Sequence, residues 1–347
     1  MGFGPTPTAS FRRRAGLLTL AAHDTMPTKR RQGAGSLPPR HEERLTEQRN
    51  PRTRLIDRLP IPEALALIHA EDRRCCEAAE SVAPEVTKAV ELVVEAFRAG
   101  GRLIYVGAGT SGRLGVLDAA EQPPTFGAPP DQVIGLIAGG APALTRSIEG
   151  AEDRAEDGLQ AVARLKVGPR DVVMGIASGG RTPYVLGALA EARRRRARTI
   201  WLACTPALEG EAPLAGCQIR PLVGPEVIAG STRMKAGTVT KLILNQISTL
   251  AMIQMGKVYQ NLMVDLRAVN AKLEARALRI LKEVTGLDDA GATRCFGAAD
   301  GELKVALIMA LAGCPAEAAR RRLKEAAGHV AAAIRSIRSS GAGNVAS

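Results

Sequence analysis

The chain has 347 residues, of which 46% are hydrophobic and only 3% aromatic. This length suffices for one large core and a smaller second one, and the Gly-rich composition favours a mixed α/β fold over an all-β fold. The formal net charge is +12, but residues 1–54 alone carry +7, from eleven Lys and Arg against four Asp and Glu. Because this excess lies in a Pro-, Gly- and Arg-rich segment without zinc-finger spacing or a helix-turn-helix pattern, it does not indicate a nucleic-acid-binding protein.

The cysteines and the hydropathy bear on the cellular compartment. Six cysteines are scattered along the chain without metal-ligand spacing, and the adjacent Cys75 and Cys76 make a poor pair for a disulfide. No stretch approaches the ~20 uninterrupted apolar residues of a membrane span. These features predict a cytoplasmic protein with reduced thiols, no bound metal and no membrane association.

The first part of the chain is predicted to change from a tail to helices. Residues 1–44 have the low-complexity, basic composition of a disordered tail. Apolar residues then recur at helical spacing over Pro62–Arg98, which predicts two helices that end before Gly100–Gly101.

Five short apolar segments then alternate with helical patterns such as Glu149–Leu165 and Pro183–Arg196. Continuous apolar strands between helices predict a doubly wound, mostly parallel five-stranded sheet of flavodoxin-like type. In such a sheet a ligand binds beyond the carboxyl ends of the strands. The predicted strands are Arg102–Val106, Val133–Ala138, Asp171–Ala177, Thr199–Cys204 and the weaker Ile219–Val223.

The last third of the chain reads as helical. Gly237–Lys257 is apolar on nearly all sides, which predicts a helix buried in the core or in a subunit interface. Residues 268–334 predict a small all-helical domain of three or four short helices, followed by a flexible C-terminus over 335–347.

A glycine-rich loop, Gly107–Gly115, follows the first predicted strand. Glycines let the backbone approach an anion, and the next helix offers free N–H groups. The loop matches the dinucleotide pattern literally, but the acidic ribose partner at the end of the second strand is missing, and no Walker lysine follows. These features favour a monophosphate site over a dinucleotide site, and a merely structural tight turn is the alternative.

Two further loops carry hydroxyl groups, Ser178–Pro183 after the third strand and Gly230–Lys235 before the long helix. The second of these also carries two cations. Three polar loops at one edge of a sheet suit a phosphorylated, polyhydroxylated ligand. For these two loops, ordinary helix caps and turns explain the residues equally well.

Two glutamates lie near these loops. Glu121 precedes Pro123 and Pro124 at the predicted end of the helix after the first loop, and Glu152 lies where the next helix is expected to begin. Either one, taken alone, is more often a solvated or capping carboxylate, and spacing does not single them out. Since no histidine falls in the loops, acid–base chemistry would depend on carboxylates or on Lys235.

Several long segments resemble the bacterial N-acetylmuramic acid 6-phosphate etherases, a family of the sugar-isomerase (SIS) superfamily that is related to glucokinase regulatory protein. The resemblance extends from about Thr46 to Ile334. It implies a SIS catalytic domain over 45–267, a sugar-phosphate substrate, no cofactor, and a homodimer whose active site is shared between subunits. The segments are Leu103–Gly127, Gly135–Asp153, Arg181–Tyr184, Gly224–Lys241 and Gly256–Arg267.

The resemblance also implies site residues. Glu121 and Glu152 correspond to the catalytic acids of the family. One departure concerns the second loop, where Gly179 stands in place of the usual serine and Ser178 comes one position early. The implied substrate-binding residues are Gly109, Thr110, Ser111, Gly112, Ser178, Gly179, Arg181, Thr182, Ser231, Thr232 and Lys235.

The implied reaction removes lactate from carbon 3 of the ring-opened sugar. A base takes the acidified proton from carbon 2, an acid protonates the departing lactate oxygen, and water then adds at carbon 3. We expect Glu121 to serve the lactate side and Glu152 to act at carbon 2 or in ring opening, because burial and neighbouring charge can hold two glutamates in opposite protonation states. The alternatives are an aldose–ketose isomerase and a non-catalytic sugar-phosphate sensor; the missing ribose partner disfavours an oxidoreductase.

Overall fold

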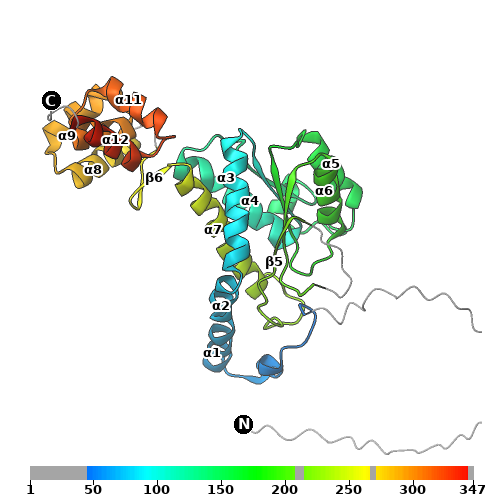
Figure 1. The fold of residues 1–347 in the computed structure, drawn as a ribbon. Helices are drawn as coiled ribbons and strands as arrows, with labels where there is room; N and C mark the ends of the chain where they lie inside the picture. Colours follow the sequence, from blue (N-terminus) through cyan, green and yellow to red (C-terminus); the bar gives the residue numbers. More distant parts are fainter. Residues whose placement is uncertain (1–44, 208–214, 266–270, 343–347) are drawn as a thin grey trace, which may run out of the picture. The chain divides into compact units, whose positions relative to one another are not determined.

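The structure is a computed structural model that describes residues 45–207, 215–265 and 271–342 (Figure 1). The predicted basic tail, residues 1–44, lies outside the described residues. Five parallel strands form one sheet in the order β2-β1-β3-β4-β5, which confirms the doubly wound, flavodoxin-like prediction. The strands are β1 (Leu103–Gly107), β2 (Val133–Ile137), β3 (Val172–Ile176), β4 (Arg198–Leu202) and β5 (Cys217–Ile219).

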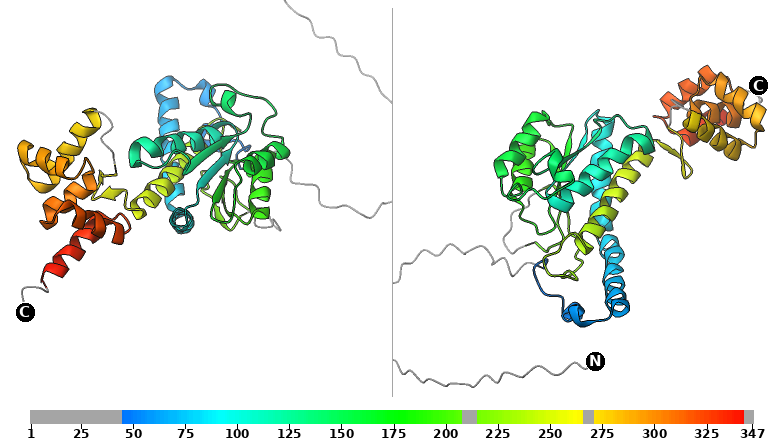
Figure 2. Two further views of the ribbon diagram at one scale, coloured as in Figure 1. Left: turned by 90° about the horizontal axis from the view of Figure 1, so that it is seen from above. Right: turned by 180° about the vertical axis from the view of Figure 1, so that it is seen from behind.

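Helices cover both faces of this sheet (Figures 1 and 2). Side chains alternate along β1, so that Leu103 and Tyr105 join one core cluster while Ile104 and Val106 join the other. Each fully buried aliphatic side chain of these cores contributes about 1.5–3 kcal/mol through removal of apolar surface from water. One face is covered by α3 (Ala83–Arg98), α4 (Gly109–Phe126) and α7 (Lys235–Gln254), the other by α5 (Ala155–Arg164) and α6 (Pro183–Arg194).

The region before the sheet differs from the sequence prediction. Between residue 45 and β1 the structure has three helices rather than two, because the helical pattern is interrupted at Arg73 and again after Glu80. Two short 3-10 turns, Pro51–Thr53 and Ile56–Arg58, come first. The helices are α1 (Ile61–Asp72), α2 (Arg74–Glu80) and α3.

Helix α4 also departs from the prediction, since it continues past Glu121 and through Pro123 and Pro124. Prolines lack the N–H that bonds four residues back, but here they lie in the last turns, where Phe126 is buried and a left-handed Gly127 (φ 62°) ends the helix. Glu121 is therefore an exposed residue inside a helix rather than at its end.

Other boundaries shift as well. The helix expected from Glu149 begins only at Ala155, so Glu152 lies in a turn. Helix α7 begins two residues earlier than expected, at Lys235. A hairpin of β6 (Val258–Tyr259) and β7 (Leu262–Met263) was not predicted.

The C-terminal region is helical, with five helices within the described residues rather than three or four (Figure 2). Their apolar cluster includes Val264, just after the hairpin. The last helix covers most of the residues that were predicted to be flexible; residues 343–347 lie outside the described part. The helices are α8 (Ala271–Thr285), α9 (Asp289–Ala298), α10 (Leu303–Ala312), α11 (Ala316–Glu325) and α12 (Val330–Ala342).

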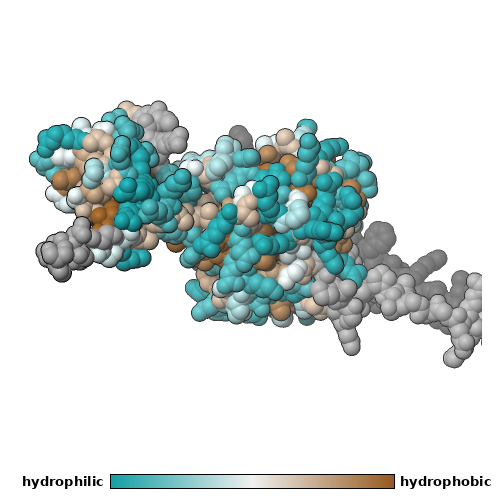
Figure 3. Space-filling model, turned by 45° about the horizontal axis from the view of Figure 1, so that its top comes forward, coloured by the Kyte–Doolittle hydropathy of each residue, from teal (hydrophilic) through white to brown (hydrophobic). Residues whose placement is uncertain are grey.

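The visible surface is largely hydrophilic, with apolar residues in small groups (Figure 3). Large exposed apolar side chains include Leu117 on α4 and Leu250 on α7. Within the described residues, no helix combines the length and the apolar character that crossing a membrane requires.

A buried carboxylate holds α4 against α7. Asp118 of α4 is 5% exposed and accepts hydrogen bonds from Tyr105 Oη (2.9 Å), Asn245 Nδ2 (2.8 Å) and Ser248 Oγ (3.0 Å). Burial raises the pKa of Asp118, and these donors oppose the rise. Because the three donors come from β1 and α7, they fix the rotation of α4 about its axis and hence the side on which Glu121 lies.

Helices α5 and α6 approach each other through glycines. A Cβ on Gly158 would lie 1.8 Å from the carbonyl oxygen of Tyr184, and a Cβ on Gly187 would lie 2.0 Å from that of Ala155. The Tyr184 N–H also donates to the carbonyl of Glu152 at 2.9 Å. This tight contact ties the turn that carries Glu152 to the start of α6.

We expect Gly158→Ala to lower the free energy of unfolding by about 1–3 kcal/mol, because the added methyl group would overlap the Tyr184 carbonyl and push the helices apart. Gly168→Ala is the matched control, since no atom lies within 4 Å of its added Cβ. Urea unfolding measured through the fluorescence of Trp201 distinguishes the two variants. Equal stability of both variants would show that the helices do not depend on this contact.

Candidate functional site

A cavity of about 300 Å³ opens at the carboxyl ends of β1 and β3. The strand order reverses between these two neighbours, because β1 is flanked by β2 and β3, and ligands of doubly wound folds bind at such a switch point. The cavity is lined by Ala108, Gly109, Thr110, Ser111, Arg113, Ala138, Ala143, Ser147, Ile148, Ala151, Glu152, Ala177, Ser178, Gly179, Thr182 and Thr232.

The turn from β1 into α4 leaves no room for side chains. A Cβ on Gly107 would lie 2.5 Å from the amide nitrogen of Gly112, and a Cβ on Gly112 would lie 2.7 Å from the carbonyl oxygen of Gly107. Gly109 has a positive φ of 52° and opens the helix. The first turn has no side-chain cap, so its N–H groups at Gly109, Thr110 and Ser111 are available to an anion in the cavity.

The other two helix starts near the cavity are already occupied. At α6, Pro183 has no N–H, Tyr184 donates to the Glu152 carbonyl, and Val185 donates to Thr182. At α7, the first two N–H groups donate to the carboxylate of Glu226, at 3.0 and 2.9 Å. The start of α4 is therefore the best place for a phosphate among these three.

The second loop contributes some of its predicted residues to the cavity. Ser178, Gly179 and Thr182 line it, whereas Arg181 does not. Gly179 brings no hydroxyl to the position where the family usually has serine, and the buried Ser178 supplies one from the preceding position. Of the third loop, Thr232 lines the cavity and Ser231 does not.

The segment between β2 and α5 forms the opposite wall and carries Glu152 and Ser147. Arg113 braces this segment, since its Nε donates to the Leu144 carbonyl (3.3 Å) and its Nη2 to that of Arg146 (3.1 Å). Sequence reasoning missed Arg113 and Ser147. Arg113 could have been found, because it lies within the glycine-rich segment Gly107–Gly115, directly after Gly112.

Glu121 does not line this cavity. It lies twelve residues after Gly109 on the same helix, roughly 18 Å along the axis at 1.5 Å per residue, and it is exposed. That separation exceeds the distance from the phosphate to carbon 3 of a sugar phosphate. Within one chain the two predicted catalytic glutamates are therefore not brought together.

Lys235, also predicted to bind the ligand, does not line this cavity either. Its side chain is fully buried, and Nζ donates to Glu71 Oε2 (2.5 Å) and to the Val223 carbonyl (2.8 Å). The sequence shows a lysine in a hydroxyl-rich loop. It does not show that Lys235 begins a helix and meets a carboxylate 164 residues away in the chain.

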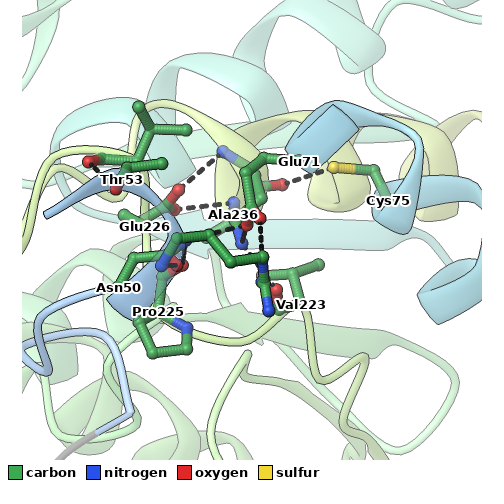
Figure 4. A network of polar contacts seen from close by, with 11 residues as sticks. Asn50, Thr53, Glu71, Cys75, Val223, Pro225, Glu226 and Ala236 are labelled. Atoms are coloured by element: carbon green, nitrogen blue, oxygen red, sulfur yellow. Dashed lines mark hydrogen bonds and ion pairs between the residues drawn. The ribbon is translucent and has the colours of Figure 1, made fainter. Parts of the chain in front are cut away.

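A buried network surrounds this ion pair (Figure 4). Glu71 is 2% exposed and also accepts from Arg52 and, at 2.8 Å, from Asn50 Nδ2. Burial opposes ionisation of Glu71, but the hydrogen bonds from Arg52, Lys235 and Asn50 outweigh it and lower the pKa of Glu71 to about 2. Asn50 also donates to the Pro225 carbonyl at 3.1 Å. The network thus fixes both ends of the loop that carries Thr232.

In the described parts of the chain, no three His, Cys, Asp or Glu side chains lie close enough together to hold a metal ion. The six cysteines are free thiols.

Comparison with known proteins gives the family. Residues 85–193 match the glucokinase regulatory protein N-terminal SIS domain. The chain is 51% identical over 290 residues to the N-acetylmuramic acid 6-phosphate etherase of Mesorhizobium japonicum. The matched region covers 84% of this chain and 94% of that protein. The chain belongs to the N-acetylmuramic acid 6-phosphate etherase family.

Two other members of the family match to a similar extent. The etherase of Rhizobium rhizogenes is 52% identical, over 84% of this chain and 95% of its own length. That of Mycolicibacterium smegmatis is 49% identical, over 83% and 97% respectively. The matched length spans nearly the whole of each relative, so both the sheet and the helical region belong to the etherase family.

We expect Glu71→Gln to lower the free energy of unfolding by about 3–5 kcal/mol, because it leaves the Lys235 charge buried without its carboxylate. The double variant Glu71→Leu, Lys235→Met should recover most of this loss, since it removes both charges. Urea unfolding near pH 7 measures both variants. Glu77→Gln on the exposed side of α2 is the control.

The loss of unfolding free energy in Glu71→Gln should become smaller as the pH falls. The folded-state pKa of Glu71 lies near 2, below its unfolded value near 4.3, so its contribution is complete above about pH 4.3 and disappears as the pH falls towards 2. The wild type and Glu71→Gln should therefore converge in stability over that range. A Glu71→Gln variant as stable as the Glu77→Gln control at pH 7 would contradict this role.

Proposed function

We propose that this chain hydrolyses the lactyl ether of N-acetylmuramic acid 6-phosphate and releases N-acetylglucosamine 6-phosphate and D-lactate. One observation carries the proposal: a single glutamate, Glu152, faces the same cavity as an uncapped helix N-terminus. The first can exchange protons with a sugar, and the second can hold its phosphate. Membership of the etherase family supports the choice of substrate.

The phosphate would bind at the start of α4. The N–H groups of that turn and the hydroxyls of Thr110, Ser111 and Ser178 are suitable donors to phosphate oxygens. Binding so far from the reacting carbons does not itself assist the chemistry. It orients carbons 2 and 3 towards the wall that carries Glu152.

Glu152 would act on the proton at carbon 2. In the ring-opened sugar the aldehyde at carbon 1 acidifies this proton, and its removal forms a double bond between carbons 2 and 3 as the carbon–oxygen bond to lactate breaks. The turn that holds Glu152 is fixed by the bond from the Tyr184 N–H and by the close contact of α5 and α6. General acid–base catalysis of this kind contributes roughly 10²–10⁴-fold.

Glu121 would donate the proton to the departing lactate oxygen and then accept one from the water that adds at carbon 3, while Glu152 returns its proton to carbon 2. It lies too far along α4 to reach a sugar in the cavity of its own chain, so we propose that it serves the cavity of a second copy in a homodimer. Leu117, 51% exposed one turn earlier on the same helix face, suits a subunit contact. The free thiols suit a cytoplasmic location.

A sugar-phosphate isomerase would need the base at carbon 2 but no acid for a leaving group. An assay for D-lactate separates the two activities, because an isomerase releases none.

We expect the purified protein to release D-lactate from N-acetylmuramic acid 6-phosphate, and Glu152→Gln and Glu121→Gln each to lower kcat by roughly 10²-fold or more. Both variants should still bind the sugar phosphate, because the phosphate donors are unchanged. Glu156→Gln, an exposed residue on α5, is the control and should keep full activity. A wild type that releases no lactate, or a Glu121→Gln variant with full turnover, would refute the assignment.

A shared site makes a further prediction about mixtures. If the two variants are unfolded together and refolded, about half of the dimers combine one chain of each kind, and each of these has one site with both glutamates. Activity should return to about a quarter of the wild-type value. Mixtures that stay inactive while forming mixed dimers would show that each chain uses its own Glu121.

A further inference from the structure

Among the described residues that line the cavity, two have charged side chains, Glu152 and Arg113. Arg113 takes no part in the proton transfers proposed above. Arg113 lies in the wall of the cavity and contacts the segment that carries Glu152, so it is placed to contact a bound ligand.

Arg113 retains donors that the protein does not use. Nε and Nη2 donate to the carbonyls of Leu144 and Arg146. A guanidinium has five N–H groups in a planar fork, so these two bonds leave three. In the described parts of the chain no acceptor meets Nη1, and the side chain is only partly buried. The two carbonyl bonds hold the fork rigidly at the edge of the cavity.

The proposed substrate carries two anionic groups, a phosphate and the carboxylate of its lactyl ether. The phosphate suits the uncapped start of α4 and the hydroxyls beside it, which are neutral donors. A carboxylate on carbon 3 would then lie near Glu152, since carbons 2 and 3 are adjacent. Two carboxylates at such a distance repel each other unless a cation lies between or beside them.

We propose, on the basis of the proposed function, that Arg113 binds the lactyl carboxylate and so determines specificity for the ether substrate over sugar phosphates without a carboxylate. Arginine suits this role, because its planar fork matches the two oxygens of a carboxylate. The brace to Leu144 and Arg146 pre-orients the fork, so that little side-chain freedom is lost on binding. After elimination, the same contact holds lactate rather than the sugar.

The test compares two changes, one in the protein and one in the ligand. In the inactive Glu121→Gln background, which keeps the substrate intact, calorimetry gives Kd for N-acetylmuramic acid 6-phosphate, for its lactyl methyl ester and for N-acetylglucosamine 6-phosphate. The ester removes the negative charge of the carboxylate. Arg113→Gln removes the positive charge of the guanidinium.

We expect Arg113→Gln to weaken binding of the acid substrate about 10- to 100-fold, as for loss of a charged hydrogen bond, with less than about threefold change for the ester and for N-acetylglucosamine 6-phosphate. Arg154→Gln is the control: Arg154 is exposed, pairs with Asp157 only at 3.8 Å and does not line the cavity, and its variant should bind all three ligands as the parent does.

Two results would overturn the inference. Equal weakening of all three ligands would mean that Arg113 contacts the phosphate or only braces the wall, and unchanged binding of the acid would mean that it contacts no ligand. Lactate release by the wild type is measured separately. A wild type without that activity refutes the proposed function, whereas an active wild type with either of these binding results refutes only the role of Arg113.

Discussion

The turn from β1 into α4 is the constraint on which the rest of the site depends. Gly107 and Gly112 lie so close that neither position admits a Cβ, and no side chain caps the helix that follows. The first amide groups of α4 are consequently open to the cavity, while the corresponding groups of α6 and α7 are occupied by Glu152 and Glu226. Among three similar loops, this difference in hydrogen bonding is the reason for placing the phosphate of the proposed substrate at the start of α4.

A second set of interactions holds the walls in place without entering the cavity. The Glu71–Lys235 ion pair and the Glu226 cap fix the loop that carries Thr232, and both carboxylates are almost completely buried. Buried charges of this kind add little net stability compared with apolar side chains, but removing one partner is costly. Their effect is to make the position of the loop specific. The close packing of α5 and α6 likewise fixes the position of the turn that carries Glu152.

The position of Glu121 on α4 is the part of the fold on which the proposed homodimer depends. Asp118 fixes the rotation of this helix against α7, which leaves Glu121 and Leu117 on the exposed side. Because a helix rises about 1.5 Å per residue, the carboxylate of Glu121 lies about three turns from the start of α4, where we propose that the phosphate binds. In the proposed mechanism a second chain therefore supplies Glu121, and the place of this residue on α4 is the reason for proposing a homodimer.

The sequence by itself determined the order of strands and helices and the chemistry of the loops. Apolar runs of strand length, separated by helical periodicity, suffice for the parallel sheet, because local spacing encodes which faces are buried. The glycine loop after β1 was likewise visible. Helix limits differed from the prediction: α4 continues through Pro123 and Pro124 to the buried Phe126, and the left-handed Gly127 ends it.

Only the tertiary structure decided which loop residues share the cavity. Lys235 and Thr232 are three residues apart, yet Lys235 begins α7 and is buried against Glu71, whereas Thr232 lies before the helix and lines the cavity. The side chain of Arg113 is held in the cavity wall by hydrogen bonds to the carbonyls of Leu144 and Arg146, more than thirty residues away in the chain. Such contacts depend on the relative positions of elements that are distant in the chain, and no local pattern in the sequence records them.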